Sequence, residues 1–117
     1  MKNDKIYEMP FAKLYPLLIS KVEKKGRTRE EIDQITCWLT GYREDQIAEF
    51  LTQDLTYGDF FLKAPQLNPD RKKITGKICG VRVEEIEEPL MQEIRYLDKL
   101  VDELAKGKRM ENILRKG

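Results

Sequence analysis

Apolar residues at helical spacing are the feature that most restricts the fold of this chain. Pro89 suits the first position of a helix, and after it apolar residues recur every three or four positions, at Leu90, Ile94, Leu97, Val101 and Leu104. This spacing places them on one face of an α-helix. Alternation of apolar and polar residues occurs only briefly, at residues 78–83, where a glycine argues against a strand. We therefore predict a long C-terminal helix in a protein without a sheet.

Other helices are indicated by apolar stripes together with helix-boundary residues. Residues 11–22 carry a second stripe, in which Pro16 predicts either a kink or a helix that starts at the proline. Thr28 and Glu31 have the spacing of a capping box, and Gly41 suits the end of the helix that they begin. Less regular patterns predict a helix at 43–53, an aromatic turn at 57–62, and short helices after Asn68, near 83–87 and at 110–114.

Together these patterns predict an all-α fold. We expect a compact orthogonal bundle of about five to seven helices, several of them short, with a long C-terminal helix. A chain of 117 residues is expected to form a single helical domain, 1–117, in which residues 1–9 are an N-terminal arm.

The sequence also carries signals about the compartment. No apolar run approaches the ~20 residues of a membrane span, and the N-terminus lacks the apolar segment of a secretory signal. Cys37 and Cys79 are far apart in the sequence and could form one disulfide, but two reduced thiols are the expected state. We therefore predict a cytoplasmic protein with no membrane partner.

Composition restricts the function. The chain has no histidine, which excludes Ser/His/Asp and Cys/His catalysis, histidine-based zinc sites and an imidazole pH switch. The 22 Lys and Arg nearly balance the 21 Asp and Glu, which argues against a nucleic-acid partner. The charges are nevertheless segregated along the chain, since residues 71–82 are basic and residues 84–88 are acidic. A near-zero net charge is therefore compatible with a polarised surface. We predict no catalytic residues, no metal and no cofactor, and the enzyme hypothesis is the weaker one.

Two sets of residues are candidates for binding. One is an aromatic set that either lines a groove or belongs to the core: Trp38, Tyr42, Tyr57, Phe60 and Phe61. The other set consists of arginines near glycine corners, two of which belong to the basic run 71–82. These arginines either bind a phosphate or pair with the acidic run 84–88. The predicted ligand-binding residues are Trp38, Tyr42, Arg43, Arg71 and Arg82. The apolar seam of the C-terminal helix, Leu90, Ile94, Leu97, Val101 and Leu104, is either core or a dimer interface.

Three other patterns each have a simpler structural interpretation. Glu84, Glu87 and Glu88 could bind Mg²⁺, but acids before a helix also stabilise its dipole. Cys79 precedes a glycine near basic residues and is either a reactive thiol or a structural one. The helix–Gly41–helix corner has helix-turn-helix spacing, but the acids of its second helix would repel phosphate, which favours a structural corner.

An internal similarity links two parts of the chain. Residues 35–47 and 74–86 align without gaps and share the pattern I-T-x-x-[LI]-x-G-x-R-x-[DE]-x-I. The pattern predicts a helix, a glycine stop and a second helix in both places. It arises either by duplication or by convergence on a common corner.

Several motifs together carry a family resemblance. These are KKGRT at 24–28, WLTGY at 38–42, APQLNP at 64–69, CGVRVEEI at 79–86 and the run 89–107. They resemble the domain-of-unknown-function 2200 family of small bacterial proteins over essentially the whole chain. The resemblance implies a compact, all-helical cytoplasmic protein and implies no activity, site residue or cofactor.

Three hypotheses for the function follow. The leading one is a non-enzymatic interaction or homo-oligomerising helical module that uses the C-terminal helix or the Trp38/Tyr42 corner, with an unknown protein or a second copy as its partner. The alternative is a binder of small phosphorylated ligands that uses the arginines near glycine corners. The weaker alternative is a nucleic-acid accessory protein with a helix-turn-helix-like corner.

Overall fold

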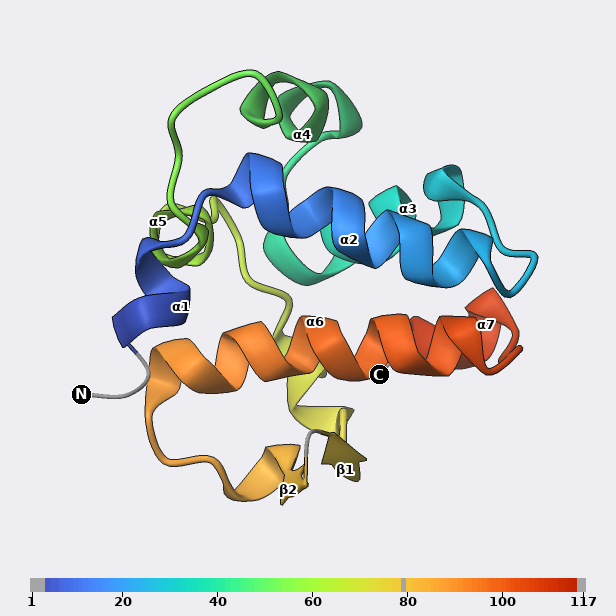
Figure 1. Cartoon of the computed structure of the whole chain (residues 1–117). Coiled ribbons are helices and arrows are strands. Elements are labelled where there is room, and N and C mark those ends of the chain that lie inside the picture. Colours follow the sequence, from blue (N-terminus) through green and yellow to red (C-terminus); the bar gives the residue numbers. More distant parts are fainter. Residues whose placement is uncertain (1–3, 79, 116–117) are drawn as a thin grey trace.

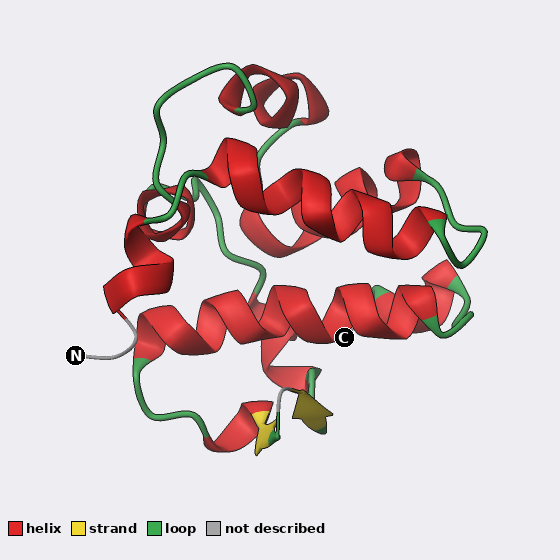
Figure 2. Cartoon of the chain, in the orientation of Figure 1, coloured by secondary structure: helices red, strands yellow, loops and turns green. Residues whose placement is uncertain are grey.

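Two long helices, α2 and α6, run side by side across the molecule (Figure 1). The structure is a computed structural model that describes residues 4–78 and 80–115. In this part of the chain, helices dominate and a two-stranded hairpin is the remaining regular element (Figure 2). The elements are α1 (Asp4–Glu8), α2 (Phe11–Glu23), α3 (Arg29–Thr40), α4 (Glu44–Phe50), α5 (Tyr57–Leu62), the 3-10 helix η1 (Pro69–Lys73), β1 (Lys77–Ile78), β2 (Val81–Arg82), the 3-10 helix η2 (Val83–Glu85), α6 (Pro89–Ala105) and α7 (Met110–Ile113).

The all-α prediction is therefore confirmed, and the predicted long C-terminal helix is α6. None of the helices in the described ranges is long and apolar enough to cross a bilayer.

The core forms around α6. Four of its five seam residues have no exposed surface at all, and they meet the buried faces of α2 and α3. Burying a large aliphatic side chain stabilises a fold by about 1.5–3 kcal/mol, so the packing of α6 contributes a large part of the stability. The central fully buried residues are Phe11 and Tyr15 from α2, Ile32, Ile35 and Leu39 from α3, and Ile94, Leu97, Val101 and Leu104 from α6.

The boundaries of α3 follow the predicted signals. The Thr28 hydroxyl accepts a hydrogen bond from the Glu31 amide at 3.2 Å, and the Glu31 carboxylate accepts one from the Thr28 amide at 3.0 Å. This is the predicted capping box. By contrast, Pro16 is exposed inside an uninterrupted α2, so the helix does not begin at the proline.

The C-terminal end of α3 is completed by a distant loop. A helix leaves its last four carbonyls without partners inside the helix. Here all four accept hydrogen bonds: Cys37 from the Gly41 amide (2.9 Å), Trp38 from the Asn68 side chain (3.2 Å), Leu39 from the Asn68 amide (3.0 Å) and Thr40 from the Gln66 amide (3.0 Å). The WLTGY and APQLNP motifs therefore form one structural unit.

Gly41 is required in this unit for two reasons. Its φ is +83°, a conformation that costs other residues energy. A Cβ at this position would also lie 2.8 Å from the Gln66 carbonyl oxygen. The predicted cap at Asn68 is present as well, because its side chain accepts a hydrogen bond from the Asp70 amide at 2.9 Å and begins η1.

Three segments differ from the sequence-based expectation. Residues 4–8, expected in a loose arm, form α1, and Gly58 lets this helix approach α5 closely, since a Cβ there would lie 3.1 Å from Tyr7. Residues 57–62, expected to form a turn, form α5, whose first turn is capped by the Thr56 hydroxyl at 3.1 Å from the Asp59 amide. The helix predicted at 43–53 is shorter and spans Glu44–Phe50.

The prediction of no strand is wrong at residues 77–82. β1 and β2 pair antiparallel, with Lys77 opposite Arg82 and Ile78 opposite Val81. Each strand has two residues, too few to produce the alternation that identifies a strand. The glycine that argued against a strand supplies the turn, since Gly80 has a φ of +82°.

Candidate functional site

The structure does not bring the predicted ligand-binding residues together. Tyr42 belongs to the core: its hydroxyl donates to the Phe60 carbonyl at 2.8 Å, its ring stacks on the Phe60 ring at 4.8 Å, and burial raises its pKa to about 12. Trp38 is half-buried and lines a shallow hollow of about 240 Å³ beside the Gly41 and Asn68 unit. Of the two aromatic candidates, Trp38 is the one that remains at the surface.

The three arginines lie on different elements and each binds a different carboxylate. Arg43, at the start of α4, lies 3.0 Å from Asp45. Arg71, on η1, binds Glu93 of α6 at 2.9 Å. Burial raises the pKa of Glu93, and the charge of Arg71 opposes that rise. The Arg71 pair therefore fastens η1 to α6.

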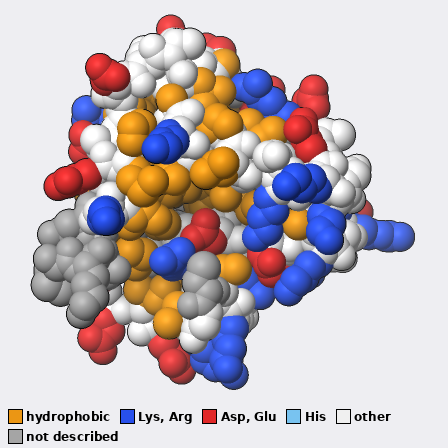
Figure 3. Space-filling view, viewed as in Figure 1, with side chains coloured by type: hydrophobic (Ala, Val, Ile, Leu, Met, Phe, Trp, Pro, Cys, Tyr) orange, Lys and Arg blue, Asp and Glu red, His pale blue; other side chains and the backbone are white. Residues whose placement is uncertain are grey.

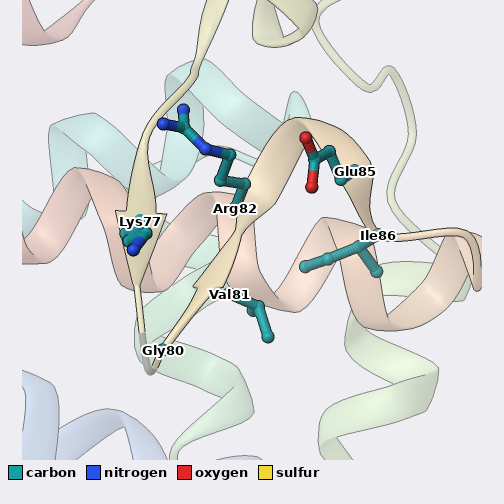
Figure 4. A pocket seen from close by; sticks show the side chains of 6 residues that line it. All are labelled: Lys77, Gly80, Val81, Arg82, Glu85 and Ile86. Carbon is teal, nitrogen blue, oxygen red and sulfur yellow. The ribbon is translucent and has the colours of Figure 1, made fainter.

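Arg82 lines a hollow of about 410 Å³ between the hairpin and the segment that follows it (Figure 4). It pairs with Glu84 at 3.3 Å. The hollow is lined by Lys77, Gly80, Val81, Arg82, Glu85 and Ile86. Because Glu85 belongs to the lining, an anion here would meet charges of both signs.

The seam proposed as an interface lies in the chain's own core. Ile94, Leu97, Val101 and Leu104 are 0% exposed, so no surface of these four side chains is available to a second copy. Leu90 alone is partly exposed.

The acidic run and the cysteines show structural contacts. Glu84 accepts a hydrogen bond from the Gly76 amide at 3.0 Å, which lowers its pKa, and Glu88 accepts one from the Tyr7 hydroxyl. Among the described residues, no three acids and thiols are placed to hold a metal ion. Burial and neighbouring acids raise the pKa of Cys37 to about 11, so it is a neutral thiol at pH 7. Cys79 lies outside the described residues.

An apolar groove that the sequence reasoning missed lies between α5 and α6. Leu62, the last residue of α5, is 68% exposed. Beside it is a hollow of about 190 Å³ whose lining is apolar except for Glu93, which Arg71 holds. We call this surface the α5–α6 groove; its lining residues are Phe61, Leu62, Leu67, Pro89, Leu90 and Glu93.

One signal in the sequence could have indicated the groove. Phe60, Phe61 and Leu62 are consecutive apolar residues in a short helix. A helix cannot turn three consecutive side chains toward one core. Phe60 and Phe61 are buried, and Leu62 is left outside.

The surface of the molecule is polarised. In Figure 3, hydrophobic side chains gather over the left half of the view, and Lys and Arg gather toward the right, where α2 and α6 end. On this face, the Lys and Arg side chains are therefore concentrated toward one end, although the net charge of the chain is near zero.

Comparison with known proteins shows the family. A model of a family described as uncharacterized protein conserved in bacteria (DUF2200) matches residues 5–115. A solved structure, described as the crystal structure of uncharacterized protein SP1917, is 58% identical, superposes with a TM-score of 0.91, and shares 94% of this chain and 90% of that one. No curated protein matches the chain. With the family match extending over nearly the whole chain, the resemblance seen in the motifs is confirmed: the protein belongs to the DUF2200 family.

Proposed function

We propose that this protein is a non-enzymatic helical interaction module that forms a homodimer through the α5–α6 groove. The observation that carries the proposal is Leu62, a large apolar side chain 68% exposed beside an apolar hollow. A single exposed leucine is ordinary on a protein surface, but the adjoining hollow, which is lined mainly by apolar residues, extends it into a contiguous apolar patch of the kind that marks interaction sites.

The groove places a protruding side chain beside a hollow, which favours pairing with a second copy. A two-fold dimer uses the same patch on both copies, so a patch suits it when the patch carries both a protrusion and a hollow that can receive it. Leu62 is the protrusion, and the hollow of about 190 Å³ beside it has room for one aliphatic side chain. The two-fold arrangement buries Leu62 twice, and each burial contributes about 2 kcal/mol.

The charges at the edge of the groove support the same arrangement. Lys63 follows Leu62 on the α5 side, and Glu87 precedes Pro89 on the α6 side; both side chains are exposed. A two-fold axis through the groove brings Lys63 of one copy toward Glu87 of the other. Complementary charges at an interface edge orient the partners more than they tighten them.

The phosphorylated-ligand hypothesis has less support. Of its three arginines, Arg82 lines one of the hollows described above, together with Lys77. Glu85 in the same lining opposes an anionic ligand. A thermal-shift screen of phosphorylated metabolites tests this hypothesis, since a ligand well above its Kd must raise the melting temperature.

Light scattering across a micromolar concentration series tests the dimer. We expect a dimer mass that Leu62→Glu converts to a monomer, with self-association weakened on the order of a hundredfold or more. Leu17→Glu is the matched control, because Leu17 is 61% exposed on α2, away from the groove, and its substitution should preserve the dimer.

Charge exchange tests the orientation of the two copies. Lys63→Glu should weaken the dimer and the added Glu87→Lys should restore it. A parent protein that is a strict monomer at hundreds of micromolar overturns the proposal, and so does a dimer broken by Leu17→Glu but not by Leu62→Glu.

A further inference from the structure

Two basic turns, about 80 residues apart in the sequence, meet at one end of the molecule. Residues 24–27, between α2 and α3, read Lys-Lys-Gly-Arg, and residues 106–109, between α6 and α7, read Lys-Gly-Lys-Arg. Arg27 joins them, because its Nη1 donates to the Leu104 carbonyl at 3.2 Å and to the Lys108 carbonyl at 2.9 Å. Both turns lie at the right of Figure 1. We call their six cationic side chains the two-turn patch: Lys24, Lys25, Arg27, Lys106, Lys108 and Arg109.

Two cations of the patch, Lys106 and Arg109, stand outward, and the two α6 carboxylates beside the patch are recessed. The side chains of Lys106 and Arg109 are 74% and 79% exposed. Asp102 and Glu103, the carboxylates that pair with Lys106 and Lys108, are only 17% and 8% exposed. Next to the patch is a hollow of about 430 Å³, lined by Lys99, Asp102, Glu103, Lys106, Gly107 and Lys108. Glu111, the partner of Arg109, is 75% exposed, so a molecule that approaches this end meets mainly cations and this one exposed carboxylate.

The positive charge exceeds what the helix ends require. The patch and the residues joined to it by ion pairs comprise eight cations and four carboxylates. The C-terminal ends of α2 and α6 each contribute about half a negative charge, so they offset only about one of the four excess charges. The cations outside the patch are Lys21 and Arg115, and the carboxylates are Glu31, Asp102, Glu103 and Glu111.

The chemistry of the turns distinguishes among polyanionic partners. Residues 24–27 and 106–109 contain only Lys, Arg and Gly. A protein interface needs apolar or aromatic anchors at its centre, and a helix or turn that enters a lipid surface needs apolar side chains to insert. A nucleic-acid backbone needs neither, because phosphate contacts by Lys and Arg supply the affinity.

We propose that the two-turn patch binds the sugar–phosphate backbone of a nucleic-acid duplex without reading its bases. The near-zero net charge does not oppose this, because the excess is concentrated at one end. The helix-turn-helix-like corner is not part of this surface: α4 begins with Glu44 and Asp45 and lies away from the patch (Figure 1).

Fluorescence anisotropy of the full chain with a labelled 20-base-pair duplex of mixed sequence tests the proposal, with DNA and RNA as parallel probes. We expect binding at 25 mM salt that weakens steeply toward 200 mM. Replacing Lys24 and Lys25 by Gln should reduce the slope of log K against log salt by about two, as should replacing Lys106 and Lys108. The control pair, Lys5→Gln with Lys13→Gln, changes two exposed lysines of α1 and α2 outside the patch and should leave the slope unchanged.

Three results overturn the proposal: no binding at the lowest salt, an equal loss in the control pair, or tighter binding to poly-glutamate or to phosphatidylglycerol vesicles than to either duplex. Circular dichroism shows whether each variant keeps its helices. The outcome is separable from the dimer proposal, because the patch variants should keep the mass of the parent in light scattering, and Leu62→Glu should keep the salt-dependent binding per protomer.

Discussion

The segments 35–47 and 74–86 share a sequence pattern but differ in structure. In the first, the last turns of α3 run into Gly41 and then α4. In the second, irregular residues lead into the β1–β2 hairpin, whose turn contains Gly80, and then into η2. The two glycines have nearly the same φ, +83° and +82°. In both segments the arginine two positions after the glycine, Arg43 or Arg82, has extended backbone and precedes a helical turn.

The difference arises upstream of the shared glycine. Residue 35 lies within a helix that the Thr28 capping box has already begun. Residue 74 follows η1 directly, and Gly76, at the position that matches Cys37, has a φ of +110° that ends any helix. The pattern therefore encodes the glycine corner and the turn after it, and the residues before it decide whether a helix or a hairpin enters the corner.

Alanine at the two glycines should separate backbone strain from steric contact. Both substitutions incur the cost of a left-handed conformation, about 1–2 kcal/mol. Only at Gly41 does the new Cβ also collide with backbone, 2.8 Å from the Gln66 oxygen, whereas nothing lies within 4 Å at Gly80. We expect urea unfolding to show a loss of about 3 kcal/mol for Gly41→Ala and about 1–2 kcal/mol for Gly80→Ala. Equal losses in the free energy of unfolding would show that the 64–68 loop moves away from the new Cβ at little energetic cost.

Removal of the Asn68 side chain should test what holds the first corner. Asn68→Ala deletes the hydrogen bond to the Trp38 carbonyl and the cap of η1. The expected loss in urea unfolding is about 2 kcal/mol, from one unpaired carbonyl and one lost cap. As a control, Gln53→Ala removes an exposed amide side chain after α4 and should change the free energy of unfolding by no more than about 0.5 kcal/mol. If Asn68→Ala leaves the free energy of unfolding unchanged, water must make the hydrogen bonds that the side chain made.

Acid should weaken the Gly76 contact of the second corner and spare the amide–carbonyl hydrogen bonds that close the end of α3 at the first. The Gly76 amide and then the local backbone and Arg82 hold the pKa of Glu84 below its ordinary value. A carboxylate with a lowered folded-state pKa contributes stability above its unfolded pKa, about 4.3, and loses it as pH falls through the folded pKa. We expect hydrogen exchange at the Gly76 amide to lose protection in that acid range. The Gln66 and Asn68 amides donate to carbonyls and should not share this dependence.

Glu84→Gln provides the control for the acid experiment. It should abolish the acid dependence at Gly76, with a small effect on global stability because the contact is exposed. If the Gly76 amide keeps the same pH profile in this variant, another group is responsible.

Local signals predicted most of the helices, and non-local packing decided the sites. The capping box at Thr28, the Gly41 stop and the stripe of α6 depend on residues within a few positions of one another, so the sequence shows them directly. The hairpin strands are too short to show a period, and α1 depends on packing against Gly58 of α5. The three arginines predicted to bind a ligand share a chemistry, but they lie on separate elements and pair with different carboxylates.

By itself, the sequence determined the helical class, the long C-terminal helix, the main helix boundaries and the family. These follow from periodicity, caps and motifs, which are contained in short stretches of chain. Only the tertiary structure placed the α6 seam in the core, left Leu62 outside beside an apolar hollow, and joined the two basic turns through Arg27. These features depend on which residues meet across long separations, and that is decided when the helices pack together.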